Sequence, residues 1–64
     1  MNLKDMKPGM RVICKLPSGE TLRAQVGRAW GEGQPQTIVR FSNGGMLFVR
    51  ESNCGLFEPD VMLN

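Results

Sequence analysis

Residues 11–16 and 20–26 alternate between apolar and polar side chains, a pattern typical of two half-buried β-strands. They are separated by residues 17–19, Pro-Ser-Gly, in which the proline fixes φ and the glycine accepts the left-handed conformation of a three-residue hairpin loop. This loop places Leu16 opposite Glu20 and predicts one apolar and one basic face. The apolar face comprises Val12, Cys14, Leu22 and Ala24. The basic face comprises Arg11, Ile13, Lys15, Thr21, Arg23 and Gln25.

A second hairpin is predicted over residues 37–50, where two apolar runs flank Asn43 and Gly44. Both residues tolerate positive φ, so the sequence predicts a two-residue type I′ turn with Phe41 opposite Met46. In this register both faces of the hairpin are largely apolar. One face comprises Val39, Phe41, Met46 and Phe48. The second face comprises Ile38, Arg40, Leu47 and Val49.

A half-exposed hairpin normally alternates between apolar and polar positions, and a small domain has one interior. The second face of this hairpin therefore needs a cover, and two alternatives stay open. Either residues 1–6 or residues 56–57 fold across it, or the face is exposed and contacts a partner protein or a second copy of the chain.

The remaining residues predict short connections. Residues 1–10 contain Pro8 and Gly9, so no helix is expected there. Gly27 is expected to mark a bulge or a sharp bend in its strand, and residues 31–36 and 52–55 to form a loop and a turn. Residues 58–61 are expected to form one 3-10 turn, and residues 62–63 a short closing strand.

Five short strands at about ten-residue spacing predict an all-β domain that spans residues 1–64. Residues 8–26 and 37–49, together with the tail 58–64, resemble the SH3-like barrel group, which includes Tudor and KOW-type modules. The resemblance implies a five-stranded SH3-like barrel with a 3-10 turn before the last strand. It does not imply a function, because one fold serves many.

Charge is distributed unevenly along the chain. The net charge is +2, but residues 1–50 carry all eight Lys and Arg against three acidic residues, a balance of +5, and residues 51–64 carry −3. This distribution is typical of ordinary solvated surface charge, and the alternative is a basic face with an acidic edge that attracts an anionic partner. Two cysteines without CxxC spacing, a polar N-terminal sequence and short apolar runs predict a cytoplasmic protein with free thiols.

The sequence predicts no enzyme, cofactor or metal site. It has no His, no zinc-ligand spacing, no nucleophile motif and no phosphate-binding loop before a helix. Cys14 lies on the apolar face and is expected to fill the core. The chain also resembles, loosely, the plasmid-type trimethoprim-resistant dihydrofolate reductases, whose site forms in a tetramer. Where they have Val-Gln-Ile-Tyr, this chain has Met-Leu-Phe-Val at residues 46–49.

Three functions follow as alternatives. The first is protein binding or self-association, with Trp30 as an exposed anchor, although this side chain would equally plug one end of a barrel. Its contact residues are Trp30, Ile38, Arg40, Leu47 and Val49. The second is nucleic-acid binding, through Arg11, Lys15, Arg23 and Arg28. The third is the oligomeric reductase that the looser resemblance implies. The small size also suits an accessory protein of a phage or mobile element.

Overall fold

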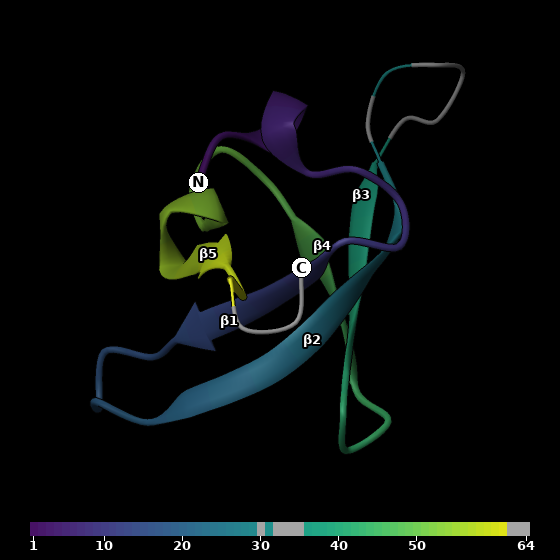
Figure 1. Ribbon diagram of the computed structural model, residues 1–64. Helices are drawn as coiled ribbons and strands as arrows, with labels where there is room; N and C mark the ends of the chain where they lie inside the picture. The colour runs from purple at the N-terminus through teal and green to yellow at the C-terminus, as the bar shows by residue number, and fades with distance from the viewer. Residues whose placement is uncertain (30, 32–35, 62–64) are drawn as a thin grey trace.

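The computed structural model describes residues 1–29, 31 and 36–61, and this part of the chain forms one antiparallel sheet (Figure 1). The strand order is β4-β3-β2-β1-β5. The strands are β1 (Arg11–Lys15), β2 (Thr21–Arg28), β3 (Thr37–Phe41), β4 (Met46–Val49) and β5 (Phe57–Pro59), and the 3-10 turns are η1 (Leu3–Asp5) and η2 (Cys54–Leu56). The all-β class is confirmed, and closure of the sheet into an SH3-like barrel stays a prediction.

The first hairpin, β1 and β2, has the register that its sequence predicts. The Leu16 amide donates to the Glu20 carbonyl at 2.8 Å, and the Gly19 amide donates to the Leu16 carbonyl at 2.9 Å. Gly19 has φ +94°, which closes the three-residue loop. The strands then pair Cys14 with Leu22. Turn chemistry and side-chain pattern point to the same register here, and the prediction is confirmed.

The second hairpin, β3 and β4, is shifted by one residue from the predicted register. The Phe41 amide donates to the Gly45 carbonyl at 2.7 Å, so the loop holds three residues, 42–44, rather than two. Gly44 takes φ +93° at the last loop position, as Gly19 does in the first hairpin. Asn43 contributes through its side chain, since its Oδ1 accepts the Gly45 amide at 2.9 Å. The type I′ prediction was therefore wrong.

This shift exchanges the two faces of β4. Leu47 and Val49 turn toward the core, and Val49 is only 3% exposed. Met46 and Phe48 turn outward and are 61% and 48% exposed. The predictions that Leu47 and Val49 form an outer contact surface, and that Met46 and Phe48 lie in the core, are corrected because a one-residue slip sends each side chain to the other face.

The core lies between the inner face of the sheet and the segments that cover it. Met6, from the N-terminal segment, and Phe57, from β5, are 1% and 2% exposed and pack with buried strand residues. The strand residues of this cluster are Val12, Cys14, Ala24, Val26, Val39 and Val49. Residues 1–6 and 56–57 were the candidates to cover the second face of the 37–50 hairpin. Both segments instead contribute a side chain to the core on the inner face of the sheet.

The C-terminal elements lie earlier in the chain than predicted. The 3-10 turn is η2, not residues 58–61, and the strand that follows it pairs Phe57 with Cys14 of β1. The cause is local: Asn53 Oδ1 accepts the Arg50 amide at 2.7 Å, which closes the preceding turn and brings Phe57 to the core. The closing strand predicted at residues 62–63 lies outside the described residues.

Two smaller predictions concern the N-terminal segment and β2. Leu3–Asp5 forms one 3-10 turn where no helix was expected, and it ends before Pro8. The bulge predicted at Gly27 is confirmed, because the β2–β3 register shifts between Val26 and Arg28. This shift leaves Arg28 paired with Ile38.

The two loop glycines give a stability prediction. Gly19→Ala and Gly44→Ala should each lower the free energy of unfolding by about 1–2 kcal/mol, because a side chain is strained at positive φ. An added Cβ meets nothing within 4 Å at either position, so the loss is one of backbone conformation. Gly55→Ala is the control, since it has open space and no positive φ. Urea denaturation measures all three, and equal stability of the Gly44→Ala and Gly55→Ala variants would contradict the positive φ of Gly44.

Candidate interaction surface

The outer face of the sheet combines cations with exposed apolar side chains. Cross-strand pairing places Met46, Arg40, Gln25 and Arg11 in one row from β4 to β1. The neighbouring row holds Phe48, Ile38 and Arg28. We define the mixed patch as the five residues Arg28, Ile38, Arg40, Met46 and Phe48. Directly opposed residues share a face of a sheet, so the mixed patch is continuous across three strands.

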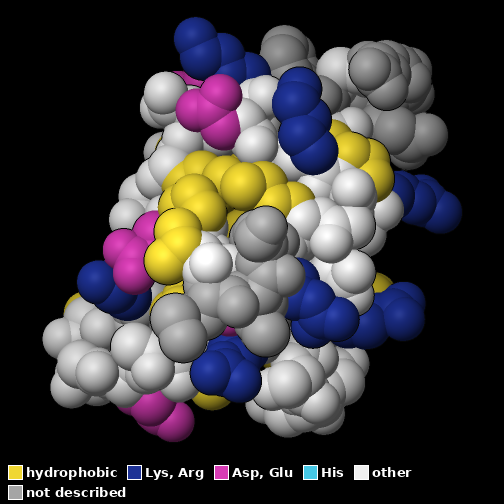
Figure 2. All heavy atoms as spheres, viewed as in Figure 1, with side chains coloured by type: hydrophobic (Ala, Val, Ile, Leu, Met, Phe, Trp, Pro, Cys, Tyr) yellow, Lys and Arg dark blue, Asp and Glu magenta, His cyan; other side chains and the backbone are white. Residues whose placement is uncertain are grey.

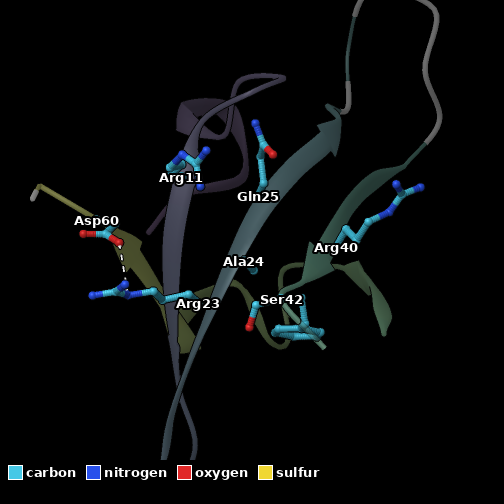
Figure 3. A pocket seen from close by; sticks show the side chains of 8 residues that line it. Arg11, Arg23, Ala24, Gln25, Arg40, Ser42 and Asp60 are labelled. Atoms are coloured by element: carbon cyan, nitrogen blue, oxygen red, sulfur yellow. Dashed lines mark ion pairs between the residues drawn. The ribbon is translucent and has the colours of Figure 1, made fainter. Parts of the chain in front are cut away.

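The mixed patch is hollowed rather than flat. A hollow of about 650 Å³ is lined by four residues of the mixed patch, by Gln25 of the same face, and by residues next to the bulge and in the N-terminal segment. Its lining comprises Gly9, Gln25, Val26, Gly27, Arg28, Ile38, Arg40 and Met46. A second hollow, of about 170 Å³, shares Gln25 and Arg40 with the first and extends toward Asp60. Figure 3 shows the residues that line this smaller hollow.

The structure holds the backbone under the mixed patch in place at several points. Gln25 Nε2 donates to the Gly9 carbonyl at 3.1 Å, which ties β2 to the N-terminal segment. The Phe48 carbonyl accepts Asn53 Nδ2 at 3.2 Å, which ties β4 to the turn that follows it. These two hydrogen bonds connect the strands under the mixed patch to the segments beside them.

The cations of the outer face differ in their partners. Lys15 Nζ lies 3.2 Å from Glu58 Oε2, and Arg23 Nε lies 3.9 Å from Asp60 Oδ2. In Figure 3 Arg23 is directed toward Asp60, whereas Arg40 is directed away from it. Within the described part of the chain, Arg28 and Arg40 are in no ion pair. The carboxylates of the C-terminal segment therefore neutralise one part of the face, and the mixed patch keeps its positive charge.

The surface view agrees with this separation of charge. Figure 2 shows acidic side chains on the left of the molecule, and several Lys and Arg side chains without acidic neighbours on the right. Lys and Arg side chains also occur on the left in this view, so a basic face with an acidic edge stays a prediction.

The predicted contact residues are only partly brought together. Ile38 and Arg40 lie on the outer face as expected, whereas Leu47 and Val49 belong to the core side. Trp30 lies outside the described residues. All four cations of the nucleic-acid alternative are exposed on β1 and β2. They are Arg11, Lys15, Arg23 and Arg28.

Met46 and Phe48 are the site residues that sequence reasoning assigned to the wrong face. Their place follows from the three-residue loop, and the first hairpin carries the signal that could have found it. In both hairpins a glycine follows two polar or turn-forming residues, Pro-Ser in one and Ser-Asn in the other. Reading the second loop by analogy with the first puts Phe48 opposite Ile38, as observed.

The chemistry available for catalysis or metal binding is limited in the described residues. They contain no group of three or more His, Cys, Asp or Glu that could hold a metal ion. Cys14 is buried, and desolvation raises the pKa of its thiol, which keeps it protonated and unreactive. None of the described helices is long and apolar enough to cross a membrane.

Comparison with known proteins adds no assignment: no family model, curated protein or solved structure matches this chain.

Proposed function

We propose that this chain is a small, non-catalytic module that binds another protein through the mixed patch. The observation that carries the proposal is the exposure of Met46 and Phe48, at 61% and 48%, beside Ile38 and Arg40. Adjacent apolar side chains left in water mark interaction surfaces. Met, Phe and Arg are also the residue types enriched at protein interfaces.

The energetic case rests on the two most exposed members. Full burial of a Phe or Met side chain contributes about 1.5–3 kcal/mol. About half of the surface of each of these two side chains is already covered. Burial of the exposed half by a partner would contribute a few kcal/mol to the free energy of binding from both side chains together. Arg40 lies beside Met46 and supplies a charged, directional contact at the rim of this apolar centre.

We further propose that the sheet curls into an SH3-like barrel and that the module works in the cytoplasm with both thiols reduced. The barrel is supported by the bulge at Gly27, which bends β2, and by the 3-10 turn that precedes the last strand. In such a barrel the mixed patch would be on the outside, where a partner has access.

Nucleic-acid binding is the second candidate, because the cations on β1 and β2 share the outer face with Arg40 and with one exposed aromatic ring, that of Phe48. Phosphates would contact the arginines and a base would stack on the ring. Ion pairing of Lys15 and Arg23 with Glu58 and Asp60 weakens this candidate, since it places carboxylates near the path of the phosphates.

A capture experiment tests the proposal. The wild-type chain and the Met46→Ser/Phe48→Ser variant are immobilised and exposed to a lysate of the organism that encodes the chain, and the captured proteins are quantified by mass spectrometry. A specific partner should be retained by the wild type and lost at least tenfold from the variant, and should rebind in purified form. The variant should stay folded, because both side chains are exposed.

Val61→Ser is the matched control, since Val61 is 81% exposed and belongs to neither hollow. This variant should capture the partner as the wild type does. Equal capture by the wild type and the Met46→Ser/Phe48→Ser variant would overturn the proposal. Recovery of nucleic acid, released steeply by added salt, would favour the second candidate instead.

A further inference from the structure

The mixed patch presents two guanidinium groups around an apolar centre, and the chain supplies neither with a carboxylate among its described residues. Arg28 and Arg40 both line the larger hollow, together with Ile38 and Met46. Two other cations of this face, Lys15 and Arg23, are paired with Glu58 and Asp60. Two cations without a carboxylate partner among the described residues therefore lie beside the exposed apolar side chains of the mixed patch.

We propose that the mixed patch binds a segment of another protein in which carboxylates accompany large apolar side chains. This inference rests on the proposed function and deepens it by naming the chemistry of the partner. The apolar side chains of the segment would lie over Met46, Phe48 and Ile38. Its carboxylates would meet Arg28 and Arg40, whose planar guanidinium groups match a carboxylate with two parallel hydrogen bonds.

A second copy of the chain is a poor occupant of the same surface. In a two-fold dimer the mixed patch would face itself, so each copy would bring its own Arg28 and Arg40. Four guanidinium groups would then surround one apolar contact, and like charges brought together across an interface oppose association. A head-to-tail contact would use the acidic edge instead, but two of its three carboxylates, those of Glu58 and Asp60, already pair with Lys15 and Arg23.

A nucleic acid is disfavoured for a related reason. A strand that followed the row from Arg40 to Arg11 would approach Asp60, which lines the smaller hollow beside Arg11 and Arg23. Its phosphates would come near the negative charge of that carboxylate, which is 2% exposed, and would have to compete for Arg23. A short acidic segment confined to the larger hollow avoids this repulsion.

The test uses the full chain, labelled with ¹⁵N, and defined peptides of equal length. The first peptide combines Glu with Leu and Phe, the second replaces each Glu by Lys, and the third replaces each Leu and Phe by Ser. The Glu/Leu/Phe peptide should shift the amide resonances of the mixed patch and bind at least tenfold more tightly than either other peptide. Both kinds of side chain are needed, so neither substituted peptide should match it.

Variants of the chain complete the test. Arg28→Gln/Arg40→Gln should weaken binding of the Glu/Leu/Phe peptide at least tenfold, and Lys4→Gln/Lys7→Gln, which removes two exposed cations outside both hollows, should not. Binding of the Lys peptide at equal strength would overturn the acidic partner and leave protein binding in place. Absence of binding by every peptide would also overturn it, while the capture experiment decides the proposed function separately.

Two further outcomes identify the other occupants. Tighter binding of oligothymidylate than of any peptide, lost in the Arg28→Gln/Arg40→Gln variant, would overturn both the inference and the proposed function in favour of nucleic acid. Concentration-dependent dimerisation in sedimentation, strengthened by the same variant, would assign the surface to a second copy of the chain and overturn the inference.

Discussion

Replacement of Phe57 by alanine is expected to unfold most of the protein at room temperature. Phe57 is 2% exposed and is among the largest fully buried side chains of the described residues. Truncation of a buried Phe to Ala costs about 3–5 kcal/mol. A single core in a chain of this size supplies about 3–5 kcal/mol of net stability, so the one substitution removes nearly all of it. Circular dichroism and urea denaturation measure the loss.

The matched control is Phe48→Ala. Phe48 is 48% exposed and lies on the outer face, so its truncation should cost less than about 1 kcal/mol and leave a folded chain. The two variants remove the same type of side chain from the two edge strands of one sheet, and the exposure of that side chain is 48% in one and 2% in the other. If Phe48→Ala proved as destabilising as Phe57→Ala, the observed register of β4 and the outer position of the mixed patch would both be wrong.

The Phe57 prediction also tests the end of the fold. The sequence suggested a closing strand at residues 62–63, whereas β5 is Phe57–Pro59 and pairs with β1. If residues 62–63 formed the closing strand, Phe57 would lie in a connecting segment. The Phe57→Ala substitution would then lower the free energy of unfolding only slightly. Severe destabilisation therefore supports the pairing of Phe57 with Cys14.

The first hairpin was predictable because two independent signals agreed. Pro17 and Gly19 specified a three-residue loop, and the register of that loop put the apolar side chains of the pair on one face, with Ile13 as the exception. The second hairpin lacked this check. Its strands are apolar on both faces, so a shift of one residue in the pairing gives an equally apolar pattern. The pattern of apolar residues therefore does not distinguish the two registers. Only the turn distinguishes the registers, and Asn43-Gly44 suits more than one loop.

The candidate site was half predictable for the same reason. Ile38 and Arg40 belong to β3, whose inward residues are Thr37, Val39 and Phe41 in either register, so the sequence placed them correctly. The two contact residues predicted on β4, Leu47 and Val49, lie on the core side because the loop has three residues and not two. The charge partners depended on the fold, because Glu58 and Asp60 reach Lys15 and Arg23 only once β5 lies beside β1.

Replacement of Val49 by lysine is the second substitution expected to unfold the chain. Val49 is 3% exposed and pairs with the buried Thr37 at the end of β4. A lysine there would bury an ammonium group without a partner, which costs several kcal/mol, or would force the strand away from the core. Either result exceeds the stability of a domain of this size. Loss of the β-sheet signal in circular dichroism should accompany loss of dispersed amide resonances.

Met46→Lys is the control within the same strand, and it makes the experiment decisive about register. Met46 is 61% exposed, so a lysine there should extend into water and lower stability by less than about 1 kcal/mol. A two-residue turn at Asn43-Gly44 would reverse both outcomes, because it would turn Met46 inward and Val49 outward. A folded Val49→Lys variant beside an unfolded Met46→Lys variant would therefore refute the three-residue loop, and with it the exposure of Met46 and Phe48 on which the binding surface depends.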